Sequence, residues 1–413
     1  MGTYTRREFL GYSLAAAAGM VLLPSAGYGS LSTTSEGVLD VPKKGYPLIE
    51  AAGSHREIGE QIGAAMKERI TSHLELSPEY STCLEFLQDG GRKKVESLME
   101  HAQELFPHYI EELKGMAESL EVPFISLFAF NCKSEISILK ETAGCSTIAL
   151  SDSERMILAH NEDGNDLCVG RMFLAKVTPP SGVTFLSFVY PGLVPGVGPS
   201  FNKYGVIQTT NYIEPRKVAD GVPRYFIGRS ILEAKSLEEA VELATITPRA
   251  FPWHYNLASL TEKRILSVET VAHPVHKHSV LEVEGLYVHT NHLIHPGMTL
   301  EDEDKTKPQL YDVPYTSSTT RMNVLSRAIE KQGPPSNLED IMKLLALHEG
   351  RPFSPCRHPE GDVHGATLGT AIFQIPGKGM TLYHGNPCRG FKIHYDLPGG
   401  DGLQNHRHPR SNE

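Results

Sequence analysis

The fold is decided by Gly144-Cys145-Ser146-Thr147-Ile148-Ala149-Leu150 together with Met156-Ile157-Leu158-Ala159-His160-Asn161-Glu162-Asp163. Ser146–Leu150 and Met156–Ala159 are rich in residues that favour strands, and Ser151–Arg155 between them has the composition of a turn. The pattern predicts an antiparallel hairpin. Such a hairpin places Asp163 beside Cys145, and Gly164 allows the chain to turn away.

The Gly-Cys pair has two interpretations. A cysteine at a strand start, beside a cluster of Asn and carboxylate side chains, would suit a nucleophile that becomes the first residue of a cleaved chain. A buried structural cysteine, with Asp163 capping a turn, fits the same hairpin. Glu162 is a second carboxylate that could take the place of Asp163.

Length and charge limit the function classes. The 413 residues suffice for one large domain or two ordinary ones, and a hydrophobic content of 40% can form a substantial core. The formal net charge of −10 argues against nucleic acid as a partner, because binding phosphates requires a basic face.

The N-terminus predicts export. Arg6-Arg7-Glu8-Phe9-Leu10 precedes an apolar run over 11–23 and a small-residue exit over 24–29, a pattern typical of a twin-arginine signal peptide over residues 1–29. A membrane anchor is the alternative, but the run is shorter than the roughly 20 residues that span a bilayer. We therefore expect cleavage near residues 25 to 30, a periplasmic or extracellular location and no stable membrane span.

Periodicity predicts a mainly helical segment before Cys145 and mainly strands after it, which indicates an α+β fold. Capping boxes at Ser54/Glu57, Ser236/Glu239 and Ser336/Glu339 mark three helix starts. Helices are expected over 54–73, 91–106, 108–120, 225–244, 316–331 and 336–347. Strands are expected over 146–150, 156–159, 174–178, 183–190, 206–210, 257–260, 265–270, 286–290, 367–374 and 380–384, with a last one near Tyr395.

Cysteine and histidine give no metal motif. The six cysteines form no CxxC pair, and Cys356 and Cys388, each next to a proline, are the pair most suited to a disulfide if one forms. The histidines show neither HExxH nor a Cys/His finger pattern, so we expect no metal. Two groups of them are interpreted as surface or hydrogen-bonding side chains: His289, His292 and His295, and His273, His276 and His278.

Six motifs in order carry a resemblance to a known family. They are Gly53-Ser54-His55-Arg56-Glu57-Ile58-Gly59-Glu60-Gln61-Ile62-Gly63, Gly144-Cys145-Ser146-Thr147, His160-Asn161-Glu162-Asp163, His289-Thr290-Asn291-His292, Ser318-Thr319-Thr320-Arg321 and Ser354-Pro355-Cys356-Arg357-His358-Pro359. From about Tyr46 to Tyr395 the chain resembles the acyl-CoA:6-aminopenicillanate (isopenicillin N) acyltransferase family. These proteins are relatives of choloylglycine hydrolases among the N-terminal nucleophile (Ntn) hydrolases.

Three positions depart from the family pattern. Ser146 stands where Thr is usual, Glu162 where an aromatic residue is common between Asn and Asp, and Thr320 where Ser often precedes the functional Arg. These departures bear on acyl-group preference more than on the nucleophile.

The resemblance implies a four-layer αββα sandwich of two antiparallel sheets between helices. It also implies self-cleavage between Gly144 and Cys145, which leaves residues 30–144 as an associated prosegment and residues 145–403 as the catalytic subunit. Residues 404–413 are interpreted as a disordered tail. The freed α-amine, with an ordinary pKa of about 7.7 to 8.0, can accept the thiol proton of Cys145.

The resemblance also assigns the supporting residues. Asp163 would hold the α-amine, and Arg321 would supply positive charge near the thiolate, unless it is an exposed helix charge. Thr320 would donate a hydroxyl. Asn291, and less strongly Asn211, end strands and would donate to the oxyanion, although Asn211 could equally be a turn residue.

The sequence thus predicts an exported cysteine amidohydrolase or acyltransferase that cleaves linear amides of small N-acyl compounds through an acyl-thioester. It needs no cofactor, with acyl-CoA as an optional co-substrate. A conjugated bile-acid hydrolase is the alternative within this class. A non-catalytic extracytoplasmic binding protein is the alternative outside it.

Overall fold

The computed structural model describes residues 33–35, 38–136, 144–215, 217–273, 275–298 and 312–398. The expected signal peptide over 1–29 and the expected tail over 404–413 lie outside these ranges, as does segment 137–143 just before Gly144.

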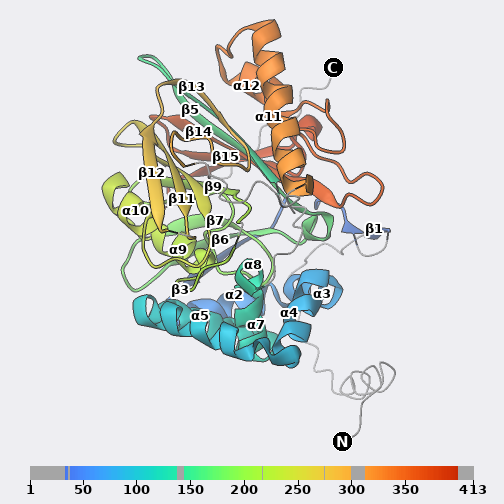
Figure 1. Cartoon of the computed structure of the whole chain (residues 1–413), viewed down its shortest axis with the longest axis vertical. Coiled ribbons are helices and arrows are strands. Elements are labelled where there is room, and N and C mark those ends of the chain that lie inside the picture. Colours follow the sequence, from blue (N-terminus) through green and yellow to red (C-terminus); the bar gives the residue numbers. More distant parts are fainter. Residues whose placement is uncertain are drawn as a thin grey trace, which may run out of the picture. The chain divides into compact units, whose positions relative to one another are not determined.

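Two large sheets form the centre of the structure (Figure 1). The eight-stranded sheet has the order β12-β11-β10-β9-β8-β7-β6-β3, with β3 Leu48–Ala52, β6 Phe173–Thr178, β7 Phe185–Val189, β8 Ser200–Asn202, β9 Val206–Tyr212, β10 Trp253–Ser259, β11 Arg264–Val271 and β12 Lys277–Glu282. The six-stranded sheet has the order β13-β4-β5-β14-β15-β16, with β13 Gly285–His289, β4 Gly144–Ser151, β5 Met156–Asn165, β14 Gly365–Ile375, β15 Gly379–His384 and β16 Lys392–Asp396. A small pair, β1 Thr33–Ser35 and β2 Val38–Leu39, stands apart from both.

Helices cover the outer face of each sheet. The layer beside the eight-stranded sheet comprises α2 His55–Ala65, α3 Lys67–Leu76, α4 Pro78–Phe86, α5 Arg92–Leu105, α6 Pro107–Leu120, α7 Phe124–Phe130, α8 Lys133–Ile136, α9 Arg224–Ile231 and α10 Leu237–Ala244. The layer beside the six-stranded sheet comprises α11 Asp312–Gln332 and α12 Leu338–Leu345. None of the helices within the described ranges is long and apolar enough to cross a membrane.

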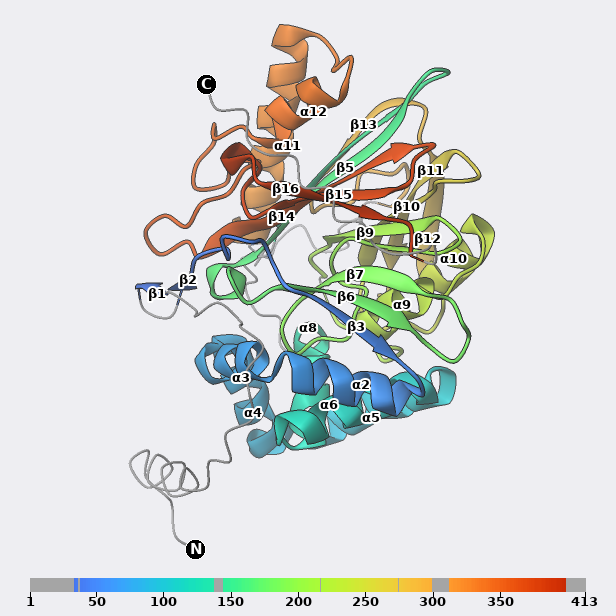
Figure 2. The same cartoon turned by 180° about the vertical axis from the view of Figure 1, so that it is seen from behind.

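The two sheets lie between layers of helices (Figure 2). Three hydrophobic cores join these layers. One core joins the first helical layer to the eight-stranded sheet, as Leu113 and Phe185 show. A second lies between the two sheets and contains Phe188 and Phe373. The third joins the six-stranded sheet to α11 and α12, with Leu325 at its centre. The arrangement is the predicted αββα sandwich.

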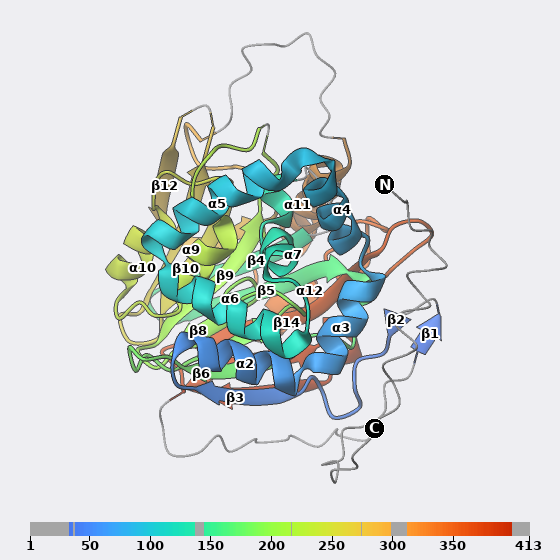
Figure 3. The same ribbon diagram turned by 90° about the horizontal axis from the view of Figure 1, so that it is seen from below.

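One strand departs from the predicted antiparallel sheets. β3 pairs in parallel with β6 at the edge of the eight-stranded sheet. Its five residues are too few to show a clear period, and its partner comes more than a hundred residues later, so only the fold places it there. The segment before Cys145 therefore contributes a strand as well as helices to the sandwich (Figure 3).

Three helix predictions need correction. The helix expected over 54–73 is broken at Met66, where φ −112° and ψ 16° let α2 and α3 both bury their apolar faces in one core. The helix expected over 225–244 is two helices, because Ser236 adopts the extended backbone of an N-cap and starts α10. The cap of α12 is Asn337 rather than Ser336, since Asn337 accepts the hydrogen bond from the Asp340 amide.

Candidate active site

The hairpin of β4 and β5 sets the position of Cys145. Gly144 lies opposite Asp163 and Cys145 opposite Glu162, which confirms the predicted pairing of the two strand ends. Because directly opposed residues of an antiparallel pair share a face, Glu162 is the carboxylate on the side of the thiol. The Cys145 Sγ donates to Glu162 Oε1 at 4.0 Å.

Glu162 is held by two further side chains that the sequence does not mark as site residues. The Tyr190 hydroxyl donates to Oε1 at 2.6 Å, and His160 Nε2 lies 3.2 Å from Oε2. Burial and the neighbouring Glu162 raise the pKa of Tyr190 well above its usual value, so its hydroxyl stays protonated and remains a donor. Tyr190 follows β7, and only the packing of the two sheets brings it to this place.

The backbone of Cys145 is fixed from the other side by Asn291 and Arg321. The Cys145 amide donates to Asn291 Oδ1 at 2.8 Å, and the Cys145 carbonyl accepts from Arg321 Nη1. Arg321 Nη2 donates to the same Oδ1 at 2.7 Å. Arg321 is fully buried, which excludes the alternative of an exposed helix charge.

The amide donors of Asn291 point away from Cys145. Nδ2 donates to the Tyr212 carbonyl at 2.9 Å, and the Asn291 backbone amide donates to Ser318 Oγ at 2.7 Å. Ser318 lies one helical turn before Arg321 in α11, so one helix orients both groups that hold the cysteine backbone. Asn291 is thus a holder of the Cys145 amide in the uncut chain.

Gly144 is crowded by two guanidinium groups. A Cβ atom built on it would lie 2.8 Å from Arg321 Nη2 and 2.8 Å from Arg357 Nη1. Any larger residue would displace one of them, so glycine is needed here for close approach rather than for a special backbone angle. Arg357 comes from the loop between α12 and β14 and belongs to a quoted motif in which it has no assigned role.

Asp163 faces away from the thiol. Its Oδ1 accepts from Thr367 Oγ1 at 2.7 Å, while Oδ2 is buried without a hydrogen-bond partner among the described residues. Burial raises the pKa of Asp163 to about 7, although Arg357 and Arg321 oppose the shift. Burial therefore favours the neutral form of the Asp163 carboxyl.

The thiol itself is disfavoured as an anion in this state. Burial, with the charges of Glu162 and Asp163, raises the pKa of Cys145 well above its usual value. Arg321 acts in the opposite direction but does not prevail. A reactive thiolate at this position needs a further positive charge close by.

Asn211 and Thr320 differ in how they relate to the cysteine. Asn211 lies inside β9, so it is no turn residue; its Oδ1 accepts from Thr147 and Asn256, and its Nδ2 is buried without a partner among the described residues. Thr320 packs its methyl group against Gly350 and makes no side-chain hydrogen bond within the described ranges.

A cavity of about 50 Å³ opens beside Cys145. Glu79 and Lys133 line it from the segment before the cysteine and form an ion pair. Its other walls include Tyr190, Trp253 and Arg224, whose guanidinium lies 3.9 Å from the centre of the Trp253 ring. The cavity is therefore small, charged and aromatic.

Metal-ligand types also meet at the cysteine. The ligand atoms of Cys145, His160 and Glu162 lie within 4.8 Å of one another, but each already has a partner in the hydrogen-bond network described above. Of the histidines interpreted as hydrogen-bonding side chains, His289 stacks on His254 at 3.5 Å and bonds Glu269, as a core histidine does.

Two similar proteins give the context of this site. A β-alanyl-dopamine/carcinine hydrolase of Drosophila melanogaster is 25% identical over 382 residues, which cover 86% of this chain and 96% of that protein. The crystal structure of a mutant of the conjugated bile acid hydrolase from Clostridium perfringens matches with a TM-score of 0.38 and 11% identity, covering 64% of this chain and 97% of that one.

The profile of one protein family matches residues 150–389, more than half of the chain. The match begins just after Cys145 and includes β5, Asn291, α11 and the loop that carries Arg357. The chain therefore belongs to the acyl-coenzyme A:6-aminopenicillanic acid acyl-transferase family of Ntn hydrolases and is an enzyme that acts on amides as a hydrolase or acyltransferase.

Proposed function

We propose that the chain cleaves itself between Gly144 and Cys145 and then hydrolyses small linear amides through an acyl-thioester on Cys145. The single observation that carries this proposal is how the junction is held. Asn291 and Arg321 fix the Cys145 amide and carbonyl, while Gly144 admits two guanidinium groups that no other residue would allow so close.

Before self-cleavage the nitrogen of Cys145 is part of a peptide bond, so Cys145 has no α-amine that could act as the base. Glu162 is suited to take the thiol proton, because its Oε1 accepts from Cys145 Sγ and its other contacts hold it in place. The thiolate attacks the Gly144 carbonyl, the bond to the Cys145 nitrogen breaks, and that nitrogen takes up a proton. The α-amine of Cys145 is then free, and water hydrolyses the thioester to release the Cys145 thiol and the Gly144 carboxylate.

Catalysis uses the new α-amine. Sγ attacks the substrate carbonyl, its proton passes through the α-amine to the leaving amine, and an acyl-thioester remains until water or a second amine removes the acyl group. Asn291 Oδ1, which accepts from the Cys145 amide in the uncut chain, is placed to orient the α-amine afterwards. Asn211 Nδ2, buried and without a described partner, is the better suited oxyanion donor of the two asparagines.

The cavity favours a small and polar acyl group. About 50 Å³ holds only a few water molecules, and charged Glu79 and Lys133 line it beside aromatic rings. A steroid acyl group is too large for this space. We therefore propose β-alanyl amides of aromatic amines, the class named for the Drosophila relative, as the first substrates to test.

We also propose that the enzyme is exported through the twin-arginine pattern Arg6-Arg7. Replacing both residues with Lys should trap the protein in the cytoplasm of a host that possesses this export route. A Lys43→Arg variant outside the signal serves as the control. Unchanged export of the double variant would contradict the proposal.

The acyl-thioester is tested by acid-quenched mass spectrometry. Cleaved protein is mixed with carcinine, β-alanyl-dopamine, a glycine-conjugated bile acid or penicillin V. We expect the large fragment to gain the mass of a β-alanyl group with the first two amides, and hydroxylamine should remove that group.

The controls separate the nucleophile from general damage. Cys145→Ala should give uncut protein without adduct, whereas Cys83→Ala, which removes a buried thiol that donates to the Ala129 carbonyl, should still form the adduct. Turnover by Cys145→Ala would contradict the proposed nucleophile. Turnover with bile-acid conjugates alone would instead favour the alternative activity.

A further inference from the structure

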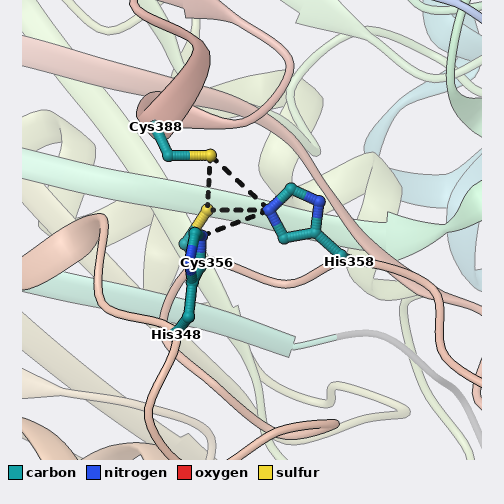
Figure 4. A group of neighbouring side chains, drawn as sticks. All are labelled: His348, Cys356, His358 and Cys388. Atoms are coloured by element: carbon teal, nitrogen blue, oxygen red, sulfur yellow. Dashed lines mark hydrogen bonds between the residues drawn. The ribbon is translucent and has the colours of Figure 1, made fainter.

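Four side chains with metal-ligand atoms converge at the end of the six-stranded sheet where β14 begins and β15 ends (Figure 4). His348 follows α12, Cys356 and His358 lie in the loop before β14, and Cys388 lies in the short helical turn Pro387–Arg389 between β15 and β16. The Sγ and Nε2 atoms face one another in Figure 4. All four ligand atoms lie within 4.8 Å of one another.

Four of the six separations between the ligand atoms match a tetrahedron around one ion, and the other two are within 4.8 Å. Zinc bonds of about 2.3 Å to sulfur and 2.0–2.1 Å to nitrogen require ligand separations of about 3.8 Å for S–S, 3.6 Å for S–N and 3.3 Å for N–N. The sulfurs of Cys356 and Cys388 are 3.7 Å apart. His358 Nε2 lies 3.6 and 3.5 Å from them and 3.3 Å from His348 Nε2.

The surrounding chain holds the ligands in place. The Cys356 amide donates to the Leu347 carbonyl at 3.0 Å, which ties the two ends of the ligand loop together. Asn386 Nδ2 donates to Cys356 Sγ at 3.5 Å and to the Arg357 carbonyl at 2.6 Å. An amide donor on a ligand sulfur is the kind of outer contact that orients metal-bound thiolates.

A disulfide or a chain of hydrogen bonds fits this geometry less well than a metal ion. A disulfide would bring the sulfurs to about 2.05 Å, whereas both cysteines are free at 3.7 Å. In a chain of hydrogen bonds between thiols and imidazoles, each group needs to contact only the next group in the chain. It gives no reason for two sulfurs and two nitrogens to converge at the separations of a tetrahedron.

We propose that His348, Cys356, His358 and Cys388 bind one zinc ion as a closed structural site. Two neutral imidazoles and two thiolates complete the four-coordinate shell, so no position is left open for substrate. The ion would join the loop after α12 to the turn between β15 and β16. This closure would stabilise the folded chain, because binding free energy adds to folding free energy.

The site also bears on the cysteine junction through Arg357. This residue stands between the ligands Cys356 and His358, and its guanidinium lies against Gly144. Its backbone amide donates to Thr367 Oγ1 at 2.8 Å, and the same hydroxyl donates to Asp163. Fixing the two flanking ligands would therefore fix the loop that presents Arg357.

The test measures zinc in untagged, reduced Cys145→Ala protein, so that metal binding is independent of self-cleavage. Elemental analysis after dialysis should find about one zinc per chain, as a closed four-ligand site requires. Cys388→Ser should lower that content at least about tenfold. Because Cys388 is exposed, its replacement removes no buried packing. Cobalt in place of zinc should give the visible bands of a tetrahedral site with thiolate charge transfer.

The matched control is Cys83→Ser, which changes a cysteine outside the cluster and should keep its zinc. Removing zinc with a chelator should lower the Tm of the Cys145→Ala protein but not that of the same protein with Cys388→Ser. The proposal would be overturned if the Cys145→Ala protein contained no more zinc than the protein that also carries Cys388→Ser. It would also be overturned by a mass lower by two hydrogen atoms in Cys145→Ala protein purified without reductant, with Cys356 joined to Cys388 in a disulfide-linked peptide.

Discussion

Cys145 lies between two carboxylates that occupy opposite faces of β5. Glu162 shares the face of the thiol, while Asp163 shares the face of Gly144 and the two arginines. The alternation of side chains along a strand produces this division. Glu162, which can take the thiol proton, is thereby separated from Asp163, which faces the two arginines.

Glu162→Gln should slow self-cleavage by about 10²-fold or more, because it removes a base within reach of the thiol but keeps the shape of the side chain. A time course of fragment appearance on a denaturing gel measures the rate. The control is Glu154→Gln in the exposed turn of the same hairpin. Cleavage of Glu162→Gln at the parental rate would exclude Glu162 as the base and return attention to Asp163.

Asp163 should make stability depend on pH. Its carboxyl pKa rises from 3.8 to about 7 on folding, so the folded state binds more protons in that window and loses stability as pH rises through it. The loss approaches about 1.4 kcal/mol per pH unit. In a Cys145→Ala background, Asp163→Asn should therefore gain Tm relative to its parent between pH 4 and 7. Asp362→Asn, a control at an exposed position, should not gain Tm relative to the parent. The same dependence of Tm on pH in the parent and both variants would refute the raised pKa of Asp163.

The sequence predicts Cys145 and its carboxylate partners because the pairing of β4 with β5 is local, and it indicates Asn291 through a family motif. Tyr190 and Arg357 could not be assigned in this way. Tyr190 reaches Glu162 only when the two sheets pack, and Arg357 reaches Gly144 only when its loop folds over the six-stranded sheet. Thr320 is indicated by its position in a motif, yet helical geometry turns Ser318 toward the site instead.

At the scale of elements, glycines let α2 and α6 pack closely. A Cβ on Gly59 would lie 1.8 Å from the Glu112 carbonyl oxygen, and one on Gly115 would lie 2.1 Å from the Arg56 carbonyl oxygen. These contacts are with backbone, which cannot move aside as a side chain can. The Gly-rich motif that begins at Gly53 is thus explained by helix packing.

Gly59→Ala and Gly115→Ala should each lower the free energy of unfolding by about 1–3 kcal/mol, because the added methyl group forces the helices apart. Chemical denaturation measures the change. Ala64→Ser, on the exposed side of α2, provides the control. If Gly59→Ala denatures at the same midpoint as the parent, the close approach of the two helices is wrong.

The sequence predicts whether a segment is a helix or a strand where its hydrophobic period extends over many residues. It does not predict where a helix is interrupted. The apolar period of 54–73 continues through Met66 because both helices face one core, so periodicity cannot reveal the break. β3 and β8 are too short to show a period of their own. Neighbouring prolines point to Cys356 and Cys388 as a pair, whereas the two histidines that join them stand at spacings that match no known metal motif.

In the molecule as a whole, the proposed cleavage point lies between two segments that share one hydrophobic core. The segment before Cys145 supplies β3 to the eight-stranded sheet and most of the helices that cover it. Leu113 from one side of the junction and Phe173 from the other belong to the same core. The two fragments should therefore remain together after the bond between them is cut.

Size-exclusion chromatography of cleaved protein should show both fragments in one peak with amidase activity. Urea should release them in the same transition that removes activity, because both fragments contribute side chains to one core. The uncut Cys145→Ala protein, in which the two segments are still joined by a peptide bond, is the control. A small fragment that leaves under native conditions while activity persists would contradict the shared core.

We propose that Cys145 becomes the first residue of the catalytic chain. This is tested by the intact mass of freshly purified protein under denaturing conditions, with N-terminal sequencing of the larger species. We expect two masses that sum to the exported chain plus one water, with the larger species beginning at Cys145. A single uncut mass in a preparation with full amidase activity would contradict it.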